Sequence, residues 1–444
     1  MLPVEVARRQ KEQWLPPAEL TTIRRQRIRA LLVKARAAPY YGRLLPGGTQ
    51  GDECLSRLPL LDKRIIVETG EKALLTVGSS DLMPVFTSGS TGHPMRFLRS
   101  PREEAEFSAR WYRVYSAYGG KSRDTLLNVG RPDAKPRGGA VKLMRDLGIL
   151  PKIENTSVTA PVEDLVRVFL EFKPDFLTGY SIGIENIADY IVRHGIEARP
   201  PKAAFCAAMD VTDRCRQLVT RALNAPAVNV YVSNEFGVIG WECPEQRGSL
   251  HVNDDMLVME ILDNDGQPVP DGTFGEVVLT SLTLTRMPLI RYRTGDTAAR
   301  IPGPCSCGRG LGLMTPVQGR TSHTIVGADG RSITTPVVGY ALGLAGADEW
   351  VRRFQLREQE NRKLVLLVEP HRQPRRRQIE SLVAQLARIA GPGYRIDIEM
   401  RDALPLAPSG KYQYVVPLPK SCPAAGSGRT GQFSGMYPVL GTGG

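Results

Sequence analysis

The sequence has no long hydrophobic run, no visible leader and few cysteines. In its 444 residues, no apolar stretch approaches the roughly 20 residues that a helix needs to cross a bilayer. The first ten residues, MLPVEVARRQ, carry no apolar core behind their charges, so we expect no secretory signal. The seven cysteines are unevenly spaced, which favours a reducing compartment over a disulfide scaffold. These absences predict a cytoplasmic protein with no membrane association.

The basic charge does not by itself indicate a nucleic-acid partner. The formal net charge is +12, but the arginines are spread along the chain, with one tight run at residues 371–377. No stretch interleaves aromatic with basic residues in the manner of a single-strand binder. The composition, 42% hydrophobic and 23% charged, is that of a soluble globular protein. We therefore favour anionic small molecules over nucleic acid as ligands.

Strand and helix patterns alternate through the middle of the chain. Apolar runs typical of buried strands alternate with amphipathic helical patterns, in the order 125–130, 162–172, 176–178, 182–194, 203–207, 213–223 and 228–232. This rhythm predicts an α/β fold with a mostly parallel sheet wrapped by helices. We also expect amphipathic surface helices in residues 1–45 and a helix over 102–118, whose aromatic residues we assign to the core.

The second half of the chain has a different texture. Runs at 257–262 and 275–280 flank a polar turn and predict a hairpin, and further strand, helix and strand patterns follow at 364–368, 376–389 and 394–399. We predict a large N-terminal domain over 1–320, with a β-rich subdomain at about 255–320. A small, mobile α+β domain follows over 321–420, and a Gly/Ser-rich flexible tail over 421–444.

Hydroxyl and glycine residues are concentrated at residues 87–92, between two apolar runs. They are Thr87, Ser88, Gly89, Ser90, Thr91 and Gly92. Glycines let backbone N–H groups approach an anion closely, and the hydroxyls add neutral donors. No Gly-Lys-Ser/Thr follows, so this is not a Walker A loop. Alone, the stretch would be read as a hairpin turn, but the other motifs favour a phosphate-binding loop.

Those motifs carry a family resemblance. The segment 87–94 resembles the phosphate loop of the adenylate-forming ligases, the superfamily of acyl-CoA synthetases and peptide-synthetase adenylation domains. Further motifs of that superfamily follow in its order: aromatic-x-x-x-Glu at 231–237, Tyr-Arg-Thr-Gly-Asp at 291–296, the hinge Gly-Arg at 319–320 and the C-terminal lysine motif at 408–411. The stretch 234–296 is most similar to phenylacetate–CoA ligases and their capsular-polysaccharide relatives. An ordered set is far more specific than one motif.

The resemblance implies ATP-dependent activation of an aromatic or small carboxylic acid as an acyl-adenylate, followed by transfer to CoA. Glu235 would coordinate Mg²⁺, and Asp296 would accept hydrogen bonds from the ribose hydroxyls. Lys411 would approach the carboxylate and the α-phosphate as a point charge. The resemblance further implies ATP contacts for Ala208, Met209, Asn234 and Arg320, and a substrate pocket near Tyr180, Phe236, Gly237, Val238 and Ile239. Taken singly, each acid or lysine would be a solvated surface residue.

The sequence departs from the family pattern at several positions. His93 stands where lysine is common, Met209 where an acid is frequent, and residues 321–323 where the hinge usually offers an aspartate. These departures leave alternatives open. One is the same activation with an amine or an acyl-carrier-protein thiol as acceptor. Another is a nucleotide-binding paralogue that has lost its chemistry. A homodimer also stays open.

A separate set of residues has the chemistry of a metal site. Cys243 and His251 form a Cys-x7-His pair, and Cys305 and Cys307 form a Cys-x-Cys-Gly-Arg turn. These are the ligands that zinc prefers, and together they make a closed tetrahedral set. Some phenylacetate–CoA ligase-like chains carry a similar pattern. The alternative is unrelated thiols and a core histidine. We predict structural zinc, because nothing nearby suggests an open position or a general base.

Overall fold

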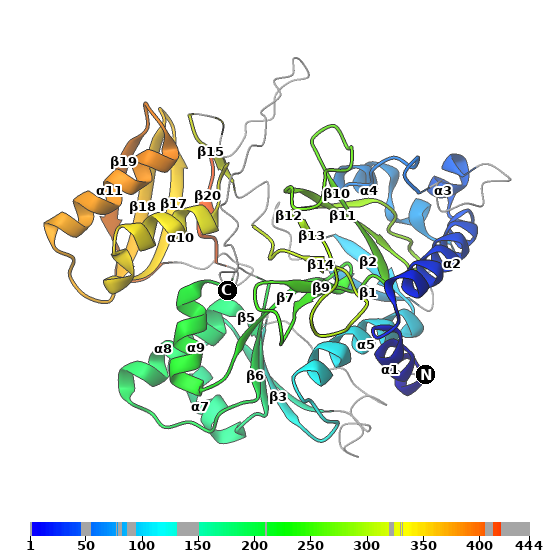
Figure 1. Ribbon diagram of the computed structural model, residues 1–444, viewed down its shortest axis with the longest axis horizontal. Coiled ribbons are helices and arrows are strands. Elements are labelled where there is room, and N and C mark those ends of the chain that lie inside the picture. Colours follow the sequence, from blue (N-terminus) through cyan, green and yellow to red (C-terminus); the bar gives the residue numbers. More distant parts are fainter. Residues whose placement is uncertain are drawn as a thin grey trace. The chain divides into compact units, whose positions relative to one another are not determined.

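The computed structural model describes residues 2–45, 55–76, 78, 82–86, 95–130, 151–208, 211–318, 324–328, 330, 332–404 and 412–418. These residues fall into two units, one running to Val317 and one beginning at Gln318 (Figure 1). Among them, no helix combines the length and the apolar character required to cross a membrane.

The first unit is built on a large mixed sheet. Its strands lie in the order β13-β14-β9-β8-β7-β6-β5-β3-β4. Neighbours from β4 to β7 are parallel, whereas β7, β8, β9, β14 and β13 pair antiparallel. The bounds are β3 Thr125–Gly130, β4 Lys152–Ser157, β5 Phe176–Tyr180, β6 Ala203–Ala207, β7 Ala227–Ser233, β8 Gly237–Glu242, β9 Leu250–Val252, β13 Arg300–Ile301 and β14 Leu313–Met314. The predicted α/β class with a parallel-rich sheet is confirmed.

Helices cover both faces of this sheet. They are α5 Pro101–Ala117, α7 Val162–Phe172, α8 Ser181–His194 and α9 Asp213–Leu223. The two faces are visible in β6, where consecutive side chains point in opposite directions. The ring of Phe205 lies 5.5 Å from that of Tyr115 in α5, while Cys206 contacts Cys215 in α9. Of the four aromatic residues of α5 predicted to lie in the core, Phe107 and Tyr115 are buried, whereas Trp111 and Tyr112 are half-buried.

A smaller antiparallel sheet adjoins the large one. It consists of β10 Leu257–Leu262, β11 Gly275–Ser281 and β12 Tyr292–Ala298, in that order. The predicted hairpin is present, with Leu257 opposite Ser281 and Leu262 opposite Glu276. However, β14 pairs with β9, so that Leu313 lies opposite His251 in the large sheet. The segment predicted as one β-rich subdomain is therefore divided between two sheets.

The N-terminal helices are joined to the sheets partly by buried ion pairs. The elements before α5 are α1 Leu2–Glu12, α2 Pro17–Ala35, α3 Pro39–Leu44, α4 Lys63–Thr69, the 3-10 turn Glu71–Leu74, and the hairpin of β1 Met83–Phe86 with β2 Arg96–Arg99. In the interior, Arg113 of α5 lies 2.8 Å from Asp255, and both side chains are fully buried. Burial alone would raise the pKa of Asp255, but Arg113 and Arg9 hold it well below its usual range. The helix α1 thus buries Arg9 rather than lying wholly on the surface.

The second unit is a small α+β structure. Its sheet has the order β19-β18-β17-β20, and its helices α10 and α11 pack against each other. Asn361 and Arg362 close the β17–β18 hairpin with positive φ angles of 59° and 53°, as a tight hairpin turn requires. The bounds are β15 Ile325–Val326, β16 Ser332–Ile333, α10 Thr335–Leu344, the 3-10 turn Ala347–Glu349, β17 Val351–Gln359, β18 Lys363–Pro370, α11 Arg376–Ala390, β19 Arg395–Met400 and β20 Val415–Val416.

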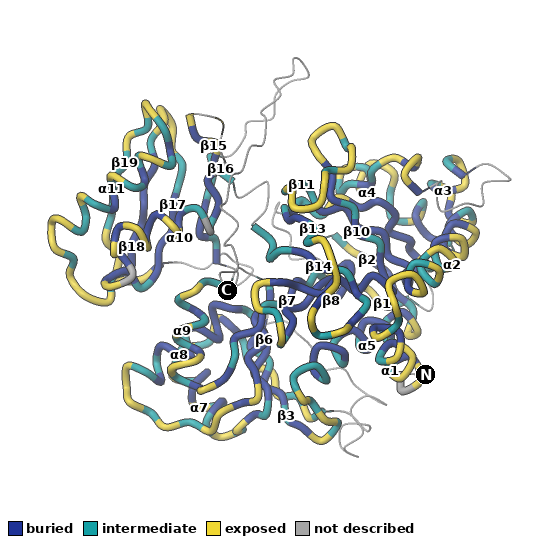
Figure 2. The backbone as a smooth tube through the Cα atoms, viewed as in Figure 1, coloured by how far each residue is buried: buried dark blue, intermediate teal, exposed yellow. Residues whose placement is uncertain are grey.

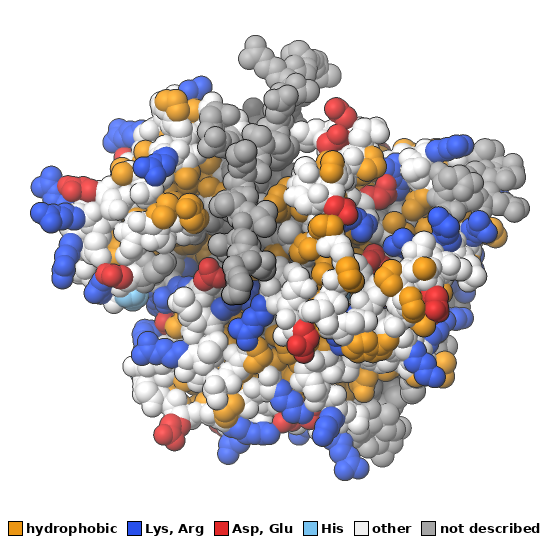
Figure 3. All heavy atoms as spheres, in the orientation of Figure 1, with side chains coloured by type: hydrophobic (Ala, Val, Ile, Leu, Met, Phe, Trp, Pro, Cys, Tyr) orange, Lys and Arg blue, Asp and Glu red, His pale blue; other side chains and the backbone are white. Residues whose placement is uncertain are grey.

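Burial and charge follow this architecture. Figure 2 shows the central strands of each unit as mostly buried tube, with exposed segments mainly at loops and on the outer sides of helices. In Figure 3, Lys and Arg side chains are scattered over the visible face among hydrophobic and acidic ones. The basic excess of the composition is thus dispersed over this face.

Candidate active site and metal centre

The two motifs that carry Glu235 and Asp296 contact each other. The hydroxyl of Tyr231, in β7, donates a hydrogen bond of 2.6 Å to Oδ2 of Asp296. The hydroxyl of Tyr292, at the start of β12, lies 3.5 Å from Oε1 of Glu235. Each of these four residues is at most 9% exposed. The fold thus brings the two acid-bearing motifs into contact, each through a tyrosine that touches the acid of the other motif.

Glu235 lies in a tightly held turn after β7. The hydroxyl of Ser233 accepts a hydrogen bond of 3.0 Å from the backbone N–H of Phe236. Gly237 follows with φ of 68°, and a Cβ there would lie 2.5 Å from the ring of Phe107. The fully buried Arg110 donates to the carbonyl of Phe236, and burial lowers the pKa of Arg110 to about 9. These contacts fix the backbone on both sides of the acid.

The residues that flank the predicted phosphate loop are anchored to the same turn. Residues 87–92 themselves lie outside the described residues. Phe86 pairs with Arg96 in the β1–β2 hairpin, so the two ends of the connecting segment meet. The side-chain amide of Asn234 donates a hydrogen bond of 2.8 Å to the carbonyl of Phe86. The residue before the loop is therefore tied to the residue before Glu235.

Asp296 projects from an irregular part of β12. Arg293 lies opposite Val278 and Thr297 opposite Glu276, so residues 294–296 stand against Val277 alone. Such a bulge redirects side chains out of the regular alternation of a strand. Thr294 fixes it, because its hydroxyl donates to the carbonyl of Val277 at 2.8 Å and accepts from the N–H of Asp296 at 3.1 Å.

The start of β12 is held by a strained arginine. Arg291 has φ of 49°, a left-handed conformation that costs a non-glycine residue on the order of 1–3 kcal/mol. Its guanidinium forms two hydrogen bonds to Glu260, at 3.1 and 3.0 Å, and donates to the carbonyls of Ser56 and Leu58 at 2.8 and 2.7 Å. These bonds offset the strain and fix the position from which Tyr292 and the bulge begin.

Other predicted residues lie at the carboxyl edge of the parallel strands. Tyr180 ends β5 and pairs with Ala207 at the end of β6, which in turn pairs with Val230 of β7. Ala208 follows with φ of 66°, again left-handed for a non-glycine residue. In open α/β sheets, ligands bind outside this edge. Met209, Arg320 and Lys411, as well as His93, lie outside the described residues.

The residues predicted to form pocket walls are mostly core residues in the structure. Phe236 and Ile239 are fully buried in the hydrophobic cluster that also holds Tyr292. Val238 is fully buried in a second cluster, with Trp241. Tyr180 is half-buried at the strand edge. A substrate pocket at Tyr180, Phe236, Gly237, Val238 and Ile239 stays a prediction.

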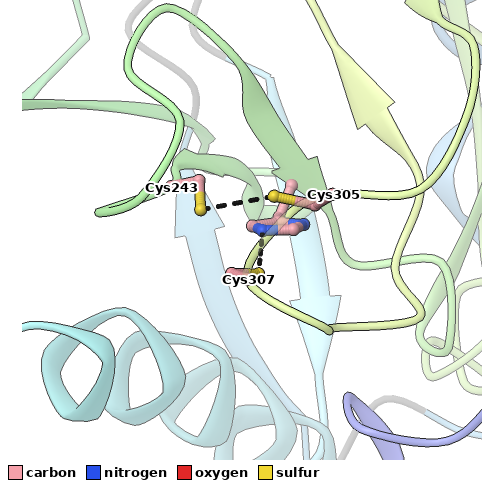
Figure 4. Close-up of side chains that lie close together, drawn as sticks. Cys243, Cys305 and Cys307 are labelled. Atoms are coloured by element: carbon pink, nitrogen blue, oxygen red, sulfur yellow. Dashed lines mark hydrogen bonds between the residues drawn. The ribbon is translucent and has the colours of Figure 1, made fainter.

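The predicted metal ligands form a compact cluster (Figure 4). Cys243 follows β8, His251 lies in β9, and Cys305 and Cys307 come from the turn before β14. The two sulfurs of Cys243 and Cys305 are 3.5 Å apart, Cys307 Sγ is 3.3 Å from His251 Nε2, and all the ligand atoms lie within 4.8 Å of one another. Tetrahedral zinc requires separations of about 3.5–3.8 Å between such atoms. The donor types are those that zinc prefers, and the two shortest separations are close to these values, whereas the widest would have to shorten on binding.

The surroundings of this cluster suit a fixed ligand set. Burial, with a smaller effect from Arg309, lowers the pKa of His251 to about 4, so its imidazole is neutral and able to bind a cation. Arg309, just after the cysteines, stacks over the rings of Trp14 and Trp241 at 4.3 and 5.1 Å. Its Nε also donates to Gln13 at 2.9 Å. The turn is thus packed against both the N-terminal helices and the sheet.

Sequence reasoning missed the contacts that organise the acids. The sequence motifs include Tyr231 and Tyr292 but predict no role for either side chain, and no sequence pattern indicates Arg110. A signal was present: each tyrosine lies four residues before the acid of its own motif. That each would contact the acid of the other motif was not visible without the fold.

Comparisons with known proteins give relatives of this chain in sequence and in structure. No protein-family model matches the sequence. The chain is 28% identical over 332 residues to a phenylacetate–coenzyme A ligase of Thermus thermophilus, covering 70% of this chain and 73% of that protein. It is 28% identical over 251 residues to protein CapK of Staphylococcus aureus, covering 55% of this chain and 53% of that one. Its structure resembles that of 2-hydroxyisobutyryl-CoA ligase in the postadenylation state in complex with R3-HIB-AMP, with a TM-score of 0.75, 18% identity and 91% of each chain covered.

The chain is thus similar in sequence to phenylacetate–CoA ligases and in fold to 2-hydroxyisobutyryl-CoA ligase, and its ordered motifs resemble those of the adenylate-forming ligases. Within that superfamily, its sequence is similar to the phenylacetate–CoA ligase branch and its CapK relatives.

Proposed function

We propose that this protein is an AMP-forming ligase that activates a carboxylic acid with ATP and transfers the acyl group to CoA. The observation that carries the proposal is the pair of contacts, Tyr231 to Asp296 and Tyr292 to Glu235, that join the two acid-bearing motifs beside the carboxyl end of β7. The hydrogen bond from Asn234 to the carbonyl of Phe86, the residue before the predicted phosphate loop, supports it. So do the sequence relatives that are named CoA ligases. We also propose that the reaction takes place in the cytoplasm, as the sequence predicts.

The chemistry requires two steps. A carboxylate is a poor electrophile, because its oxide is a poor leaving group. An oxygen of the substrate carboxylate attacks the α-phosphorus of ATP, and the bond to pyrophosphate breaks, leaving a mixed anhydride. The thiolate of CoA then attacks the acyl carbon, and AMP leaves with the electron pair of the broken C–O bond. In this scheme, the chain must bind polyphosphate, orient the ribose and place the two reacting oxygens in line.

The residues at the site suit those tasks. Asp296 offers carboxylate oxygens that accept from ribose hydroxyls. Glu235 offers the oxygen ligands that Mg²⁺ prefers, and bound Mg²⁺ would supply charge neutralisation at the phosphates. The loop at 87–92 would donate to the β- and γ-phosphates, and Lys411 to the α-phosphate. We expect an aromatic or small acid as the substrate.

The direct test is ATP–pyrophosphate exchange against a panel of carboxylic acids. We expect at least one aromatic or small acid to raise exchange well above the acid-free rate, and the same acid to consume CoA with release of AMP. Exchange without thioester formation would favour an amine or an acyl carrier protein as acceptor, the alternative raised by the altered hinge at 321–323. Firm ATP binding with no exchange for any acid would contradict the proposal and favour a paralogue without chemistry.

We also propose that Cys243, His251, Cys305 and Cys307 hold one structural zinc ion. The convergence of these four donors within 4.8 Å supports this, as does their origin in segments far apart along the chain. A single ion would tie the end of β8, the strand β9 and the turn before β14. None of these residues contacts Glu235 or Asp296 in the described structure, so the expected role is stability.

Replacing Cys305 with serine is expected to remove zinc and to lower the thermal midpoint by several degrees. A hydroxyl is a poor zinc ligand, and loss of a structural metal is among the largest single-site effects on stability. Elemental analysis of protein purified without chelator should give about one zinc per wild-type chain, and exchange per folded molecule should change little. Cys215→Ser, which alters a buried thiol in α9, serves as the control that keeps its zinc. Metal-free wild-type protein whose four ligands are readily alkylated would contradict the proposal.

A further inference from the structure

The two motifs at the site have the same spacing between a tyrosine and an acid, and each tyrosine contacts the acid of the other motif. Tyr231 precedes Glu235 by four residues, and Tyr292 precedes Asp296 by four residues. In the structure, Tyr231 contacts Asp296, and Tyr292 approaches Glu235. Each motif therefore supplies an acid and a hydroxyl, and the hydroxyl goes to the acid of the other motif.

The backbone explains why such hydroxyls matter. Tyr292 lies in regular pairing, opposite Leu279, and Tyr231 pairs with Gly240 within β7, next to a register shift between residues 231 and 232. The two acids lie outside regular strand pairing, because Glu235 follows the end of β7 and Asp296 lies in the bulge of β12. The backbone at both acids is held by other contacts, but each carboxylate can still rotate about its own side-chain bonds. A hydroxyl on a strand is thus a fixed point that orients the acid before ligand binds.

The two contacts differ in strength. At 2.6 Å, the bond from Tyr231 to Asp296 has the length of a charge-assisted O–H···O⁻ hydrogen bond. At 3.5 Å, the contact between Tyr292 and Glu235 is at the outer limit for a hydrogen bond. The tyrosine rings themselves belong to the hydrophobic cluster of this unit, which holds both hydroxyls in place. Tyr231 is therefore the stronger of the two supports.

We infer that Tyr231 is a positioning residue, which orients the carboxylate of Asp296 toward the ribose hydroxyls of ATP. The inference rests on the proposed ribose-binding role of Asp296. Through this bond, the motif that carries Glu235 sets the geometry of the acid in the other motif. Tyr292 gives weaker support to Glu235 in the opposite direction.

The test compares ATP with its 2′-deoxy and 3′-deoxy analogues in equilibrium binding to the full-length protein. Phenylalanine at position 231 keeps the ring in the core and removes only the hydroxyl. We expect Tyr231→Phe to weaken ATP binding by about tenfold, the usual cost of a hydrogen bond to a charged group. One analogue lacks the ribose hydroxyl that donates to Asp296. For that analogue, we expect Tyr231→Phe to weaken binding by about twofold or less, because the hydrogen bond that Tyr231 supports is already absent. In the exchange assay, the loss should appear mainly in KM for ATP.

Matched variants separate the explanations. Tyr118→Phe removes another tyrosine hydroxyl, bonded at 2.9 Å to the carbonyl of Glu242, and should not alter nucleotide binding. Tyr292→Phe should shift the Mg²⁺ dependence of exchange slightly and show no preference among the nucleotides. Asp296→Asn should lose the discrimination between ATP and the sensitive analogue.

The outcomes distinguish this inference from the proposed function. If Asp296→Asn loses the discrimination but Tyr231→Phe weakens all three nucleotides equally, Asp296 contacts the ribose and the positioning role is wrong. If neither variant affects the discrimination, the ribose assignment itself is wrong and the inference falls with it. If the binding differences hold but no acid supports exchange, the positioning role stands and the ligase function does not.

Discussion

Replacing Lys411 with alanine is expected to slow adenylation by on the order of 10²–10³-fold, while transfer from a supplied acyl-adenylate to CoA stays nearly intact. Lys411 lies outside the described residues, so this expectation rests on the Pro-Ser-Gly-Lys motif at 408–411. During adenylation, negative charge is redistributed at the α-phosphate, where an ammonium donor stabilises the transition state. In the second step, the thiolate attacks the acyl carbon and the phosphoryl bond is already made. The lysine is then far less necessary.

The two half-reactions are measured separately. Acid-dependent ATP–pyrophosphate exchange reports the first, and thioester formation from synthetic acyl-adenylate and CoA reports the second. Lys363→Ala is the control, because this lysine is paired with Asp397 on the sheet of the second unit and has no proposed role in catalysis. An equal loss in both half-reactions would mean that Lys411 is structural.

Replacing Glu235 with glutamine is expected to reduce exchange by on the order of 10²-fold at low Mg²⁺, with partial recovery as Mg²⁺ is raised. A neutral amide is a weaker ligand for a hard cation than a carboxylate, and the metal contributes several kcal/mol to a phosphoryl-transfer transition state. Glutamine has nearly the same shape. The turn held by Ser233, Gly237 and Arg110 should therefore survive.

The measurement is the exchange rate across a Mg²⁺ titration, together with the thermal midpoint. Glu245→Gln changes an exposed acid ten residues further along and should behave as wild type. A wild-type rate at every Mg²⁺ concentration in Glu235→Gln would exclude this acid from the metal site. A large decrease in the thermal unfolding midpoint of Glu235→Gln would instead indicate that Glu235 has a structural role.

Local sequence signals were sufficient for many elements. The bounds of α7, β6 and α9 agree with the predicted 162–172, 203–207 and 213–223. Their patterns are strongly periodic, and their ends are marked chemically. Thr212 caps the start of α9 through the N–H of Cys215 at 3.1 Å, and Asn224 ends it with φ of 47°. Capping and turn residues act over a few positions, so sequence reveals them.

Other strands depended on partners far away in the chain. The strand β8 was not predicted, because Gly237–Glu242 is buried on both faces and shows no alternation of apolar and polar residues. It forms a strand because β7 and β9 pair with it on either side. The same holds for β14, which is two residues long and exists through its pairing with β9 and β13. Such pairing is a property of the assembled sheet.

The sequence alone determined the chemical inventory of this protein: the acids Glu235 and Asp296, and the thiol and imidazole ligands. Their type and order survive any rearrangement of the chain. Tertiary structure decided which of them meet. Leu313 opposite His251 brings the Cys305–Cys307 turn to Cys243, and the bulge at 294–296 aims Asp296 at Tyr231. Strand register and bulges depend on packing across the whole sheet, so no local pattern encodes these contacts.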